Sequence, residues 1–177
     1  RRRQRQMCIR DRGNHDAWMR NYFKKELGID VFFEPKKFKI NSKKFFIGHG
    51  DGLGPGDYGY KFLKLIFRNS FFKFLFSCIH PDISIRIGEY LSRKNSVISG
   101  KEIKFESNEK ELLFNYCKKI LKSDHYNYFV FGHRHLPLKI NLGNNSEYYN
   151  CGDWLNHYSY LDFTNSELTL KYFNPEI

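Results

Sequence analysis

The sequence predicts an α/β (α+β) domain in which short strands and helices alternate, with a helical cap inserted near its middle. Apolar runs of strand length stop at glycines 48 and 132. Between them lie two stretches with the spacing of amphipathic helices, at 60–78 and 80–95. The chain has 177 residues, of which 18% are aromatic. This is enough to build one domain with a hydrophobic core, and it excludes a disordered chain.

The first twelve residues, RRRQRQMCIRDR, have a composition unlike the rest of the chain. They hold six arginines and one aspartate, which leaves +6 of the formal charge of +11 for the other residues. The segment resembles the peptide produced when sequencing-adapter DNA is translated. We therefore expect a non-native head at 1–12 and the domain proper at 13–177. A genuine basic arm that binds nucleic acid is the alternative, but the remaining charge is a weak case for it, and we expect no nucleic-acid partner.

The domain is expected to begin with GNHD at 13–16 and a helical stretch, AWMRNYFKKELG, for which Gly28 is the expected C-cap. Short strands should follow at 31–35, 36–41 and 43–50, the last two as a hairpin. The glycine-rich loop at 50–59 lacks the Lys-Ser/Thr ending of a P-loop, so it is weak evidence for phosphate binding.

The expected cap spans about 58–100. Its first helix, 60–78, has a broad apolar face rich in phenylalanine, and lysines and arginines share the rest of its surface. The second should begin near Pro81. An ordinary αα-hairpin packed into a core remains open as an alternative. The excess of phenylalanine and the interleaved cations favour contact with a lipid surface or an acyl chain.

The C-terminal part should contain one more helix and five strands. Asn108 and Glu111 suggest a capping box for the helix, and a strand at 127–131 leads into GHRH. Four strands follow: PLKINL, SEYYNC, YSYLDF and ELTLKYF, with turns at NN and TNSE. No run of about 18 apolar residues predicts a transmembrane helix. The four cysteines form no CxxC pair, which indicates free thiols in a reducing compartment.

Three signatures, each with a glycine before its ligand-type residue, stand in order along the chain: GNHD at 13–16, GHGD at 48–51 and GHRH at 132–135. Each places a metal-ligand type of side chain next to the glycine. Asn14 offers an amide oxygen, and His49, His133 and His135 offer imidazoles, which suit a divalent metal. One such loop alone is as well explained by unrelated exposed histidines. Three of them in this order predict a shared metal site at the strand ends.

These motifs resemble those of the calcineurin-like metallophosphoesterases, whose ordered motifs are D-x-H, G-D-x-x-D, G-N-H-D/E, G-H and G-H-x-H. The last three are present, and the first two are absent from a chain that we expect to be truncated at its N-terminus. The resemblance implies a four-layer αββα sandwich, incomplete at the N-terminus. It also implies two divalent metal ions, expected to be Mn²⁺. By motif match, Asn14, His49 and His133 would bind one ion and His135 the other.

The resemblance also implies roles in hydrolysis. Two metal ions would activate water and neutralise phosphate charge during in-line attack. His15 matches the catalytic histidine of the family, which stabilises the transferring phosphate or protonates the leaving oxygen. Asp16 would orient His15, although a helix N-cap is an equally open reading of Asp16.

Within the family, the run HGDGLGPGDYGYKFLK and the basic aromatic insert are similar to the pyrophosphatases of lipid A biosynthesis. The similarity implies a UDP-linked glycolipid substrate, release of UMP, and a lid over the acyl chains. It also implies a cytoplasmic enzyme that is peripheral on the inner membrane. Asp57 matches a substrate-contacting aspartate, and Asn14, Lys61 and Arg93 complete the candidate substrate contacts. His15 is a departure, because better-known members of this group have arginine there.

Two further functions remain open from the sequence. The chain could be another metallophosphoesterase, acting on a nucleotide or a phosphoprotein. It could also be a non-catalytic interaction scaffold of the same fold, although such scaffolds tend to lose the histidine at position 15. His80, His125 and His157 are expected to be structural or on the surface. The segment Asn150–Trp154 is expected to pack beneath the metal loop.

Overall fold

A computed structural model describes residues 9–11, 13, 21–54, 58–99, 107 and 111–174. The chain divides into two compact units. One consists of residues 1–55 and 108–177, and the other of residues 56–107. The second unit has bounds close to those expected for the inserted cap, 58–100.

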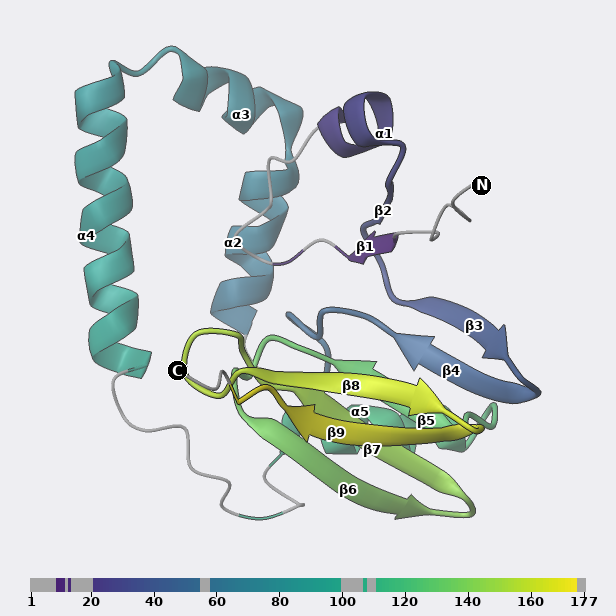
Figure 1. The fold of residues 1–177 in the computed structure, drawn as a ribbon. Helices are drawn as coiled ribbons and strands as arrows, with labels where there is room; N and C mark the ends of the chain where they lie inside the picture. The colour runs from purple at the N-terminus through teal and green to yellow at the C-terminus, as the bar shows by residue number, and fades with distance from the viewer. Residues whose placement is uncertain are drawn as a thin grey trace. The chain divides into compact units, whose positions relative to one another are not determined.

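The first unit is built on a mixed five-stranded sheet with the order β3-β4-β5-β7-β6 (Figure 1). The pairs β3–β4 and β6–β7 are antiparallel, whereas β5 runs parallel to both β4 and β7. The sequence predicted all five strands and the turn at Asn144 and Asn145. Their bounds are β3 (Lys36–Ile40), β4 (Lys43–Ile47), β5 (Tyr128–Phe131), β6 (Pro137–Gly143) and β7 (Ser146–Cys151).

One face of this sheet is covered by helix α5 (Leu112–Leu121). Successive strand residues point to opposite faces, so Phe46, Phe129 and Tyr148 share this face. They form a core with Leu113 and Cys117 of the helix. Glu111 is the N-cap residue just before the helix, and its side chain makes no capping hydrogen bond. The predicted capping box is therefore wrong for Glu111, and Asn108 lies outside the described residues.

The other face is covered by a hairpin of β8 (Ser159–Thr164) and β9 (Glu167–Tyr172), as the sequence predicted. Phe45, Tyr128 and Tyr149 point to this side and pack against Leu168. The Tyr149 hydroxyl donates a hydrogen bond to the Leu168 carbonyl oxygen at 2.7 Å. In Figure 1 the hairpin lies in front of the sheet and α5 behind it. Helix, sheet and hairpin therefore form three successive layers.

The N-terminal part adds helix α1 (Tyr22–Leu27) and two short strands. Gly28 ends the helix with φ +64°, the left-handed conformation expected of a glycine C-cap. Strand β2 (Asp30–Phe32) pairs in parallel with β1 (Ile9–Asp11). Strand β1 lies in the segment 1–12, which was expected to stand outside the domain. Its three residues nevertheless pair with β2.

The second unit is helical and exposes apolar side chains. It consists of α2 (Tyr58–Arg68), α3 (Ser70–Ser77) and α4 (Pro81–Ser99). The single helix expected over 60–78 is wrong. The chain leaves the helix at Asn69, whose side-chain oxygen accepts a hydrogen bond from the Phe71 N–H at 2.8 Å and caps α3. Within the described residues, every helix is too short or too polar to span a bilayer.

Candidate metal centre

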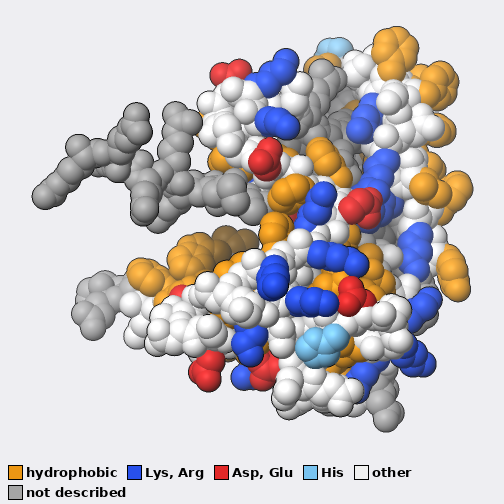
Figure 2. Space-filling view, turned by 90° about the vertical axis from the view of Figure 1, so that its right-hand side faces the viewer, with side chains coloured by type: hydrophobic (Ala, Val, Ile, Leu, Met, Phe, Trp, Pro, Cys, Tyr) orange, Lys and Arg blue, Asp and Glu red, His pale blue; other side chains and the backbone are white. Residues whose placement is uncertain are grey.

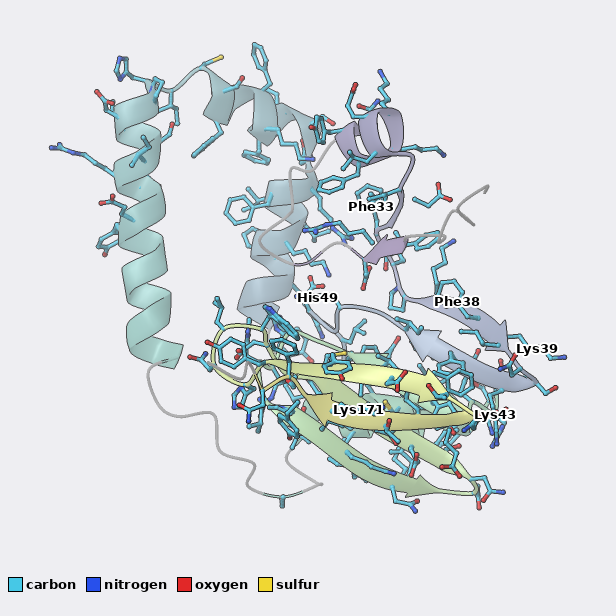
Figure 3. All side chains as sticks on the ribbon, in the orientation of Figure 1. Phe33, Phe38, Lys39, Lys43, His49 and Lys171 are labelled. Atoms are coloured by element: carbon cyan, nitrogen blue, oxygen red, sulfur yellow. The ribbon has the colours of Figure 1, made fainter. Side chains whose placement is uncertain are left out.

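Two of the predicted ligands lie side by side at the ends of β4 and β5. Because these strands are parallel neighbours, their carboxyl ends meet at one edge of the sheet. The pairing continues past both strands, since Gly48 donates to the Val130 carbonyl at 3.1 Å and Gly132 donates to the His49 carbonyl at 3.0 Å. The rings of His49 and His133 then stand edge to face, with centroids 5.3 Å apart. Figure 3 shows His49 at the end of β4.

The loop that carries His133 and His135 has an uncommon backbone. Both residues have positive φ, +64° and +53°, in the left-handed region that non-glycine residues rarely adopt. Asn150 on β7 holds the start of this loop: its buried side-chain amide donates to the Gly132 carbonyl oxygen, and its side-chain oxygen accepts the Gly152 N–H at 3.1 Å. The imidazole loop is therefore tied to the neighbouring strand.

Arg134, between the two histidines, joins the loop to helix α5 through an ion pair. One of its guanidinium nitrogens lies 3.1 Å from the Glu111 carboxylate at the start of α5. The Glu111 side chain is only 2% exposed, and that of Arg134 is 33% exposed. A carboxylate buried to this degree needs a cationic partner. Glu111 is thus a partner of the histidine loop, a role that its expected place in a capping box concealed.

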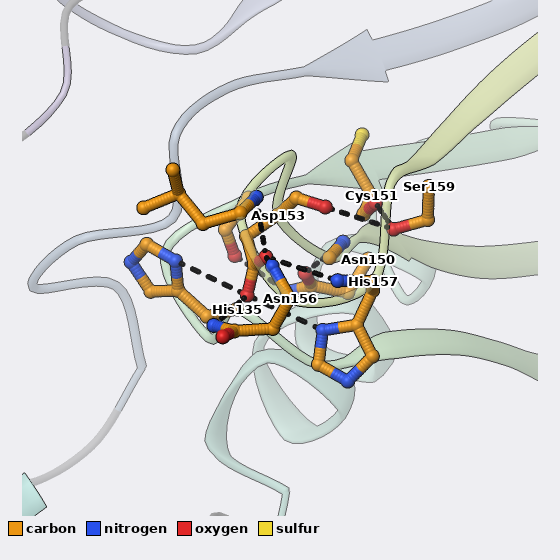
Figure 4. Close-up of polar contacts among 10 residues, drawn as sticks. His135, Asn150, Cys151, Asp153, Asn156, His157 and Ser159 are labelled. Carbon is orange, nitrogen blue, oxygen red and sulfur yellow. Dashed lines mark hydrogen bonds and ion pairs between the residues drawn. The ribbon is translucent and has the colours of Figure 1, made fainter. Parts of the chain in front are cut away.

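Asp153 is the third residue that lies against this loop, next to His135. Its Oδ2 lies 3.9 Å from His135 Nδ1 and 3.2 Å from His157 Nδ1, and Figure 4 shows it between the two rings. Burial alone would raise the pKa of this carboxyl. Hydrogen bonds from Asn156 and His157 outweigh burial and hold the pKa well below its ordinary value. Asp153 therefore presents an ionised carboxylate to both imidazoles.

The other candidate residues are placed less fully. Lys61 lies on α2 and is half-buried, and Arg93 falls within α4, where only the backbone is described. The rest lie outside the described residues: Asn14, His15, Asp16 and Asp57.

The residue types that the structure brings together fit a divalent metal ion in part. His49 and His133 are half-buried imidazoles on adjacent loops, as two ligands of one ion require. In the part of the chain that the structure describes, no group of three or more His, Cys, Asp or Glu residues forms a metal site. His135 is 61% exposed and turns toward Asp153. A third ligand to the His49–His133 pair would have to come from elsewhere, such as the GNHD segment.

The sequence did not single out two residues that contact the histidine loop, Asp153 and Glu111. Asp153 follows a glycine just after a strand, the same pattern that singled out the histidine motifs, so a signal was present. His157, expected to be structural or on the surface, shares the Asp153 carboxylate. Glu111 gave no such signal, because an acidic residue before an apolar helix is also typical of helix capping.

Comparison with known proteins gives relatives of one kind. No protein-family profile matches the chain. Three curated proteins named UDP-2,3-diacylglucosamine hydrolase are similar to it, which confirms the resemblance drawn from the motifs. The protein from Porphyromonas gingivalis is 28% identical over 173 residues, covering 90% of this chain and 66% of the relative.

The other two relatives are more distant or shorter in overlap. The protein from Shewanella baltica is 23% identical over 159 residues, covering 90% of this chain and 65% of the relative. The protein from Wigglesworthia glossinidia brevipalpis is 28% identical over 142 residues, covering 80% and 55%. The chain thus spans somewhat less than two thirds of the length of the relatives that it matches.

Proposed function

We propose that this chain carries part of the active site of a two-metal phosphoester hydrolase. Its substrate would be UDP-2,3-diacylglucosamine, cleaved at the diphosphate to UMP and 2,3-diacylglucosamine 1-phosphate. The observation that carries the proposal is the pair of imidazoles, His49 and His133, set edge to face where two parallel strands end. The names of the three relatives support the substrate.

In this proposal the residues of the three motifs divide the work. Asn14, His49 and His133 hold one divalent ion, and His135 belongs to the second. When bound, the two ions, proposed to be Mn²⁺, supply positive charge that lowers the pKa of a water molecule and screens the phosphate oxygens. His15 donates a proton to the leaving oxygen, and Asp16 keeps its ring oriented.

The layers of the first unit support the metallophosphoesterase fold. Helix α5, the five-stranded sheet and the β8–β9 hairpin are stacked in that order. We propose that they belong to the four-layer αββα sandwich.

The second unit supports a lipid-linked substrate. Among its described residues, the large exposed apolar side chains include Tyr58, Phe62, Leu65, Phe71, Phe72, Phe74, Leu75, Ile83, Ile85, Ile87 and Tyr90. Basic residues interleave with them along the same helices, among them Lys64 and Lys73. Such surfaces lie at the boundary between lipid headgroups and acyl chains. Asp57, Lys61 and Arg93 would contact the sugar or the phosphates.

The chain's charge fits work at an anionic membrane face. Residues 13–177 carry +6 of the formal net charge, and Figure 2 shows lysine and arginine side chains with hydrophobic side chains between them. Clusters of cations strengthen attraction to anionic lipid. We therefore place the enzyme at the cytoplasmic face of the inner membrane, as a peripheral protein.

The test measures UMP release from UDP-2,3-diacylglucosamine in the presence of Mn²⁺, with the product of the complete reading frame. His49→Ala and His133→Ala should each lower the rate at least 100-fold, because each removes a metal ligand. The matched control is His125→Ala. His125 lies before the start of β5, at the opposite end from His133, and contacts the Asn144 carbonyl oxygen. If His49→Ala and His133→Ala were as active as His125→Ala and the parent enzyme, the proposed metal centre would be rejected.

A second assay separates a lipid substrate from a soluble one. The double variant Phe71→Ser/Phe74→Ser removes two exposed side chains of α3. It should slow hydrolysis of the diacylated substrate and leave that of a water-soluble phosphodiester unchanged. An unchanged rate with the diacylated substrate would favour an enzyme that acts on a nucleotide or a phosphoprotein.

A further inference from the structure

Asp153 is a buried carboxylate held in one orientation by its own turn. Its side chain is 6% exposed. Oδ1 accepts hydrogen bonds from the backbone N–H groups of Leu155 at 2.9 Å, of Asn156, and of His157 at 3.3 Å. Oδ2 faces the imidazoles and also accepts a hydrogen bond from the Asn156 side-chain amide at 3.3 Å. Residues that are packed and bonded on one side are well suited to orient a group on the other.

The turn that carries Asp153 is itself well anchored. The Ser159 N–H donates to the Asp153 carbonyl oxygen at 3.2 Å. The neighbouring Trp154 packs on Phe173, with ring centroids 5.7 Å apart, and on Tyr158 at 6.2 Å. Gly152, with φ +70°, lies so close to Pro137 that a Cβ there would collide with the proline ring. The position of the carboxylate is therefore fixed by the surrounding chain.

His135, by contrast, has little else to hold its ring. It is mostly exposed and has positive φ, and an exposed imidazole rotates freely unless a partner holds it. Asp153 Oδ2 lies 3.9 Å from His135 Nδ1, which is near enough for an ion pair only with a protonated ring and is too long for a hydrogen bond. His157 shares the same oxygen at 3.2 Å. The carboxylate thus sits between two imidazoles, one closely bonded and one within reach.

We propose that Asp153 is a positioning residue for His135: a small rotation of the exposed ring brings Nδ1–H within hydrogen-bond distance of Oδ2, and the carboxylate then holds that side of the ring and leaves Nε2 to face a divalent cation. The proposal rests on the metal centre of the proposed function and extends it by a residue that none of the histidine motifs contains. A carboxylate behind a metal-binding histidine fixes the tautomer and makes the imidazole a better donor. His157 would complete a bridge of the form His–Asp–His.

The test compares Asp153→Asn with the parent chain. The asparagine oxygen can still accept the backbone N–H groups of the turn, but its NH₂ group is a donor. A donor that faces Nδ1 favours the tautomer with the proton on Nε2, which blocks the nitrogen that would bind the metal. The control is Asp162→Asn, on β8, whose carboxylate pairs with Lys171 in the same unit and contacts neither histidine.

Two readouts are needed. The ¹⁵N shifts of the His135 ring, recorded without metal at a pH where the ring is neutral, should show a proton on Nδ1 in the parent and on Nε2 in Asp153→Asn. Affinity for Mn²⁺, measured by calorimetry on the product of the complete reading frame, should fall by roughly 10- to 100-fold in Asp153→Asn. It should stay within about twofold in the control. An unchanged His135 tautomer and unchanged affinity would overturn the proposal.

A second variant covers the case in which Asp153→Asn fails to fold. His157→Gln removes the imidazole that is closely bonded to Oδ2 and leaves the carboxylate in place. The His135 ring shifts should then move, because the carboxylate is shared differently; unmoved shifts would overturn the proposal. Because the ring shifts are read without metal or substrate, they test the Asp153–His135 contact separately. If the wild-type protein shows the Nδ1–H tautomer of His135 but releases no UMP, the proposed function is rejected and the Asp153–His135 contact is not.

Discussion

The buried ion pair between Glu111 and Arg134 gives the sharpest stability prediction. Arg134→Met keeps much of the side-chain volume but leaves the Glu111 carboxylate, 2% exposed, without its cation. Breaking a fully buried pair costs about 3–5 kcal/mol. The Arg134 side chain is 33% exposed, so water would replace part of the lost interaction, and we expect a loss of about 2–3 kcal/mol. For a chain of this size, that corresponds to a fall in Tm of roughly 4–12 °C.

Thermal and urea denaturation followed by circular dichroism measure this loss. Lys139→Met is the matched control, because Lys139 pairs with Glu147 at a similar 3.0 Å but the two side chains are 53% and 26% exposed. It should cost no more than about 1 kcal/mol. Adding Glu111→Gln to Arg134→Met should recover part of the loss, since the buried charge is then removed. Equal losses in Arg134→Met and Lys139→Met would refute the argument that burial sets the magnitude.

Two further predictions follow from the environments of single groups. A hydrogen bond from the Tyr126 hydroxyl at 2.7 Å, then the charges of Lys44 and Lys37, lower the pKa of Asp124 to about 2 from an ordinary 3.8. Its stabilising contribution is therefore present above about pH 4 and is lost as the pH falls toward 2. Tyr126→Phe should move the carboxyl pKa upward in an NMR titration, and an unmoved pKa would contradict this. Burial raises the pKa of the Cys117 thiol, so a thiol reagent should label exposed Cys78 in the native protein and Cys117 only after unfolding, as peptide mapping would show.

Strands and turns were predictable because their signals are local. The strands of the sheet are short apolar runs bounded by turn residues, and Asn144–Asn145 adopt the positive φ that such turns require. The break at Asn69 was not predicted. The phenylalanine pattern runs through both α2 and α3, and the cap depends on one side chain that bonds two residues ahead. Apolar spacing alone cannot tell one long helix from two short ones.

In the candidate site, too, the features with local sequence signals could be predicted and those that depend on long-range contacts could not. His49 and His133 could be paired from the sequence, because each follows a strand-like run and a glycine, and parallel strands end at one edge. The residues that contact the histidine loop could not be predicted from the sequence. Arg134 meets Glu111 across 23 positions of the sequence, and His135 meets Asp153 across 18. Such contacts depend on how α5 and the turn after β7 are placed on the sheet.

These remote partners explain how the loop keeps a backbone that its own residues disfavour. A non-glycine residue with positive φ costs about 1–3 kcal/mol, at the low end for histidine, which adopts this conformation more readily than most. His133 and His135 together then cost roughly 2 kcal/mol or more. The Asn150 hydrogen bond and the Glu111–Arg134 ion pair offset a cost of that size, and each comes from a different element. The geometry of the imidazoles is therefore set largely by residues outside the motif. Changes to those residues should disturb the candidate metal centre while every histidine remains in place.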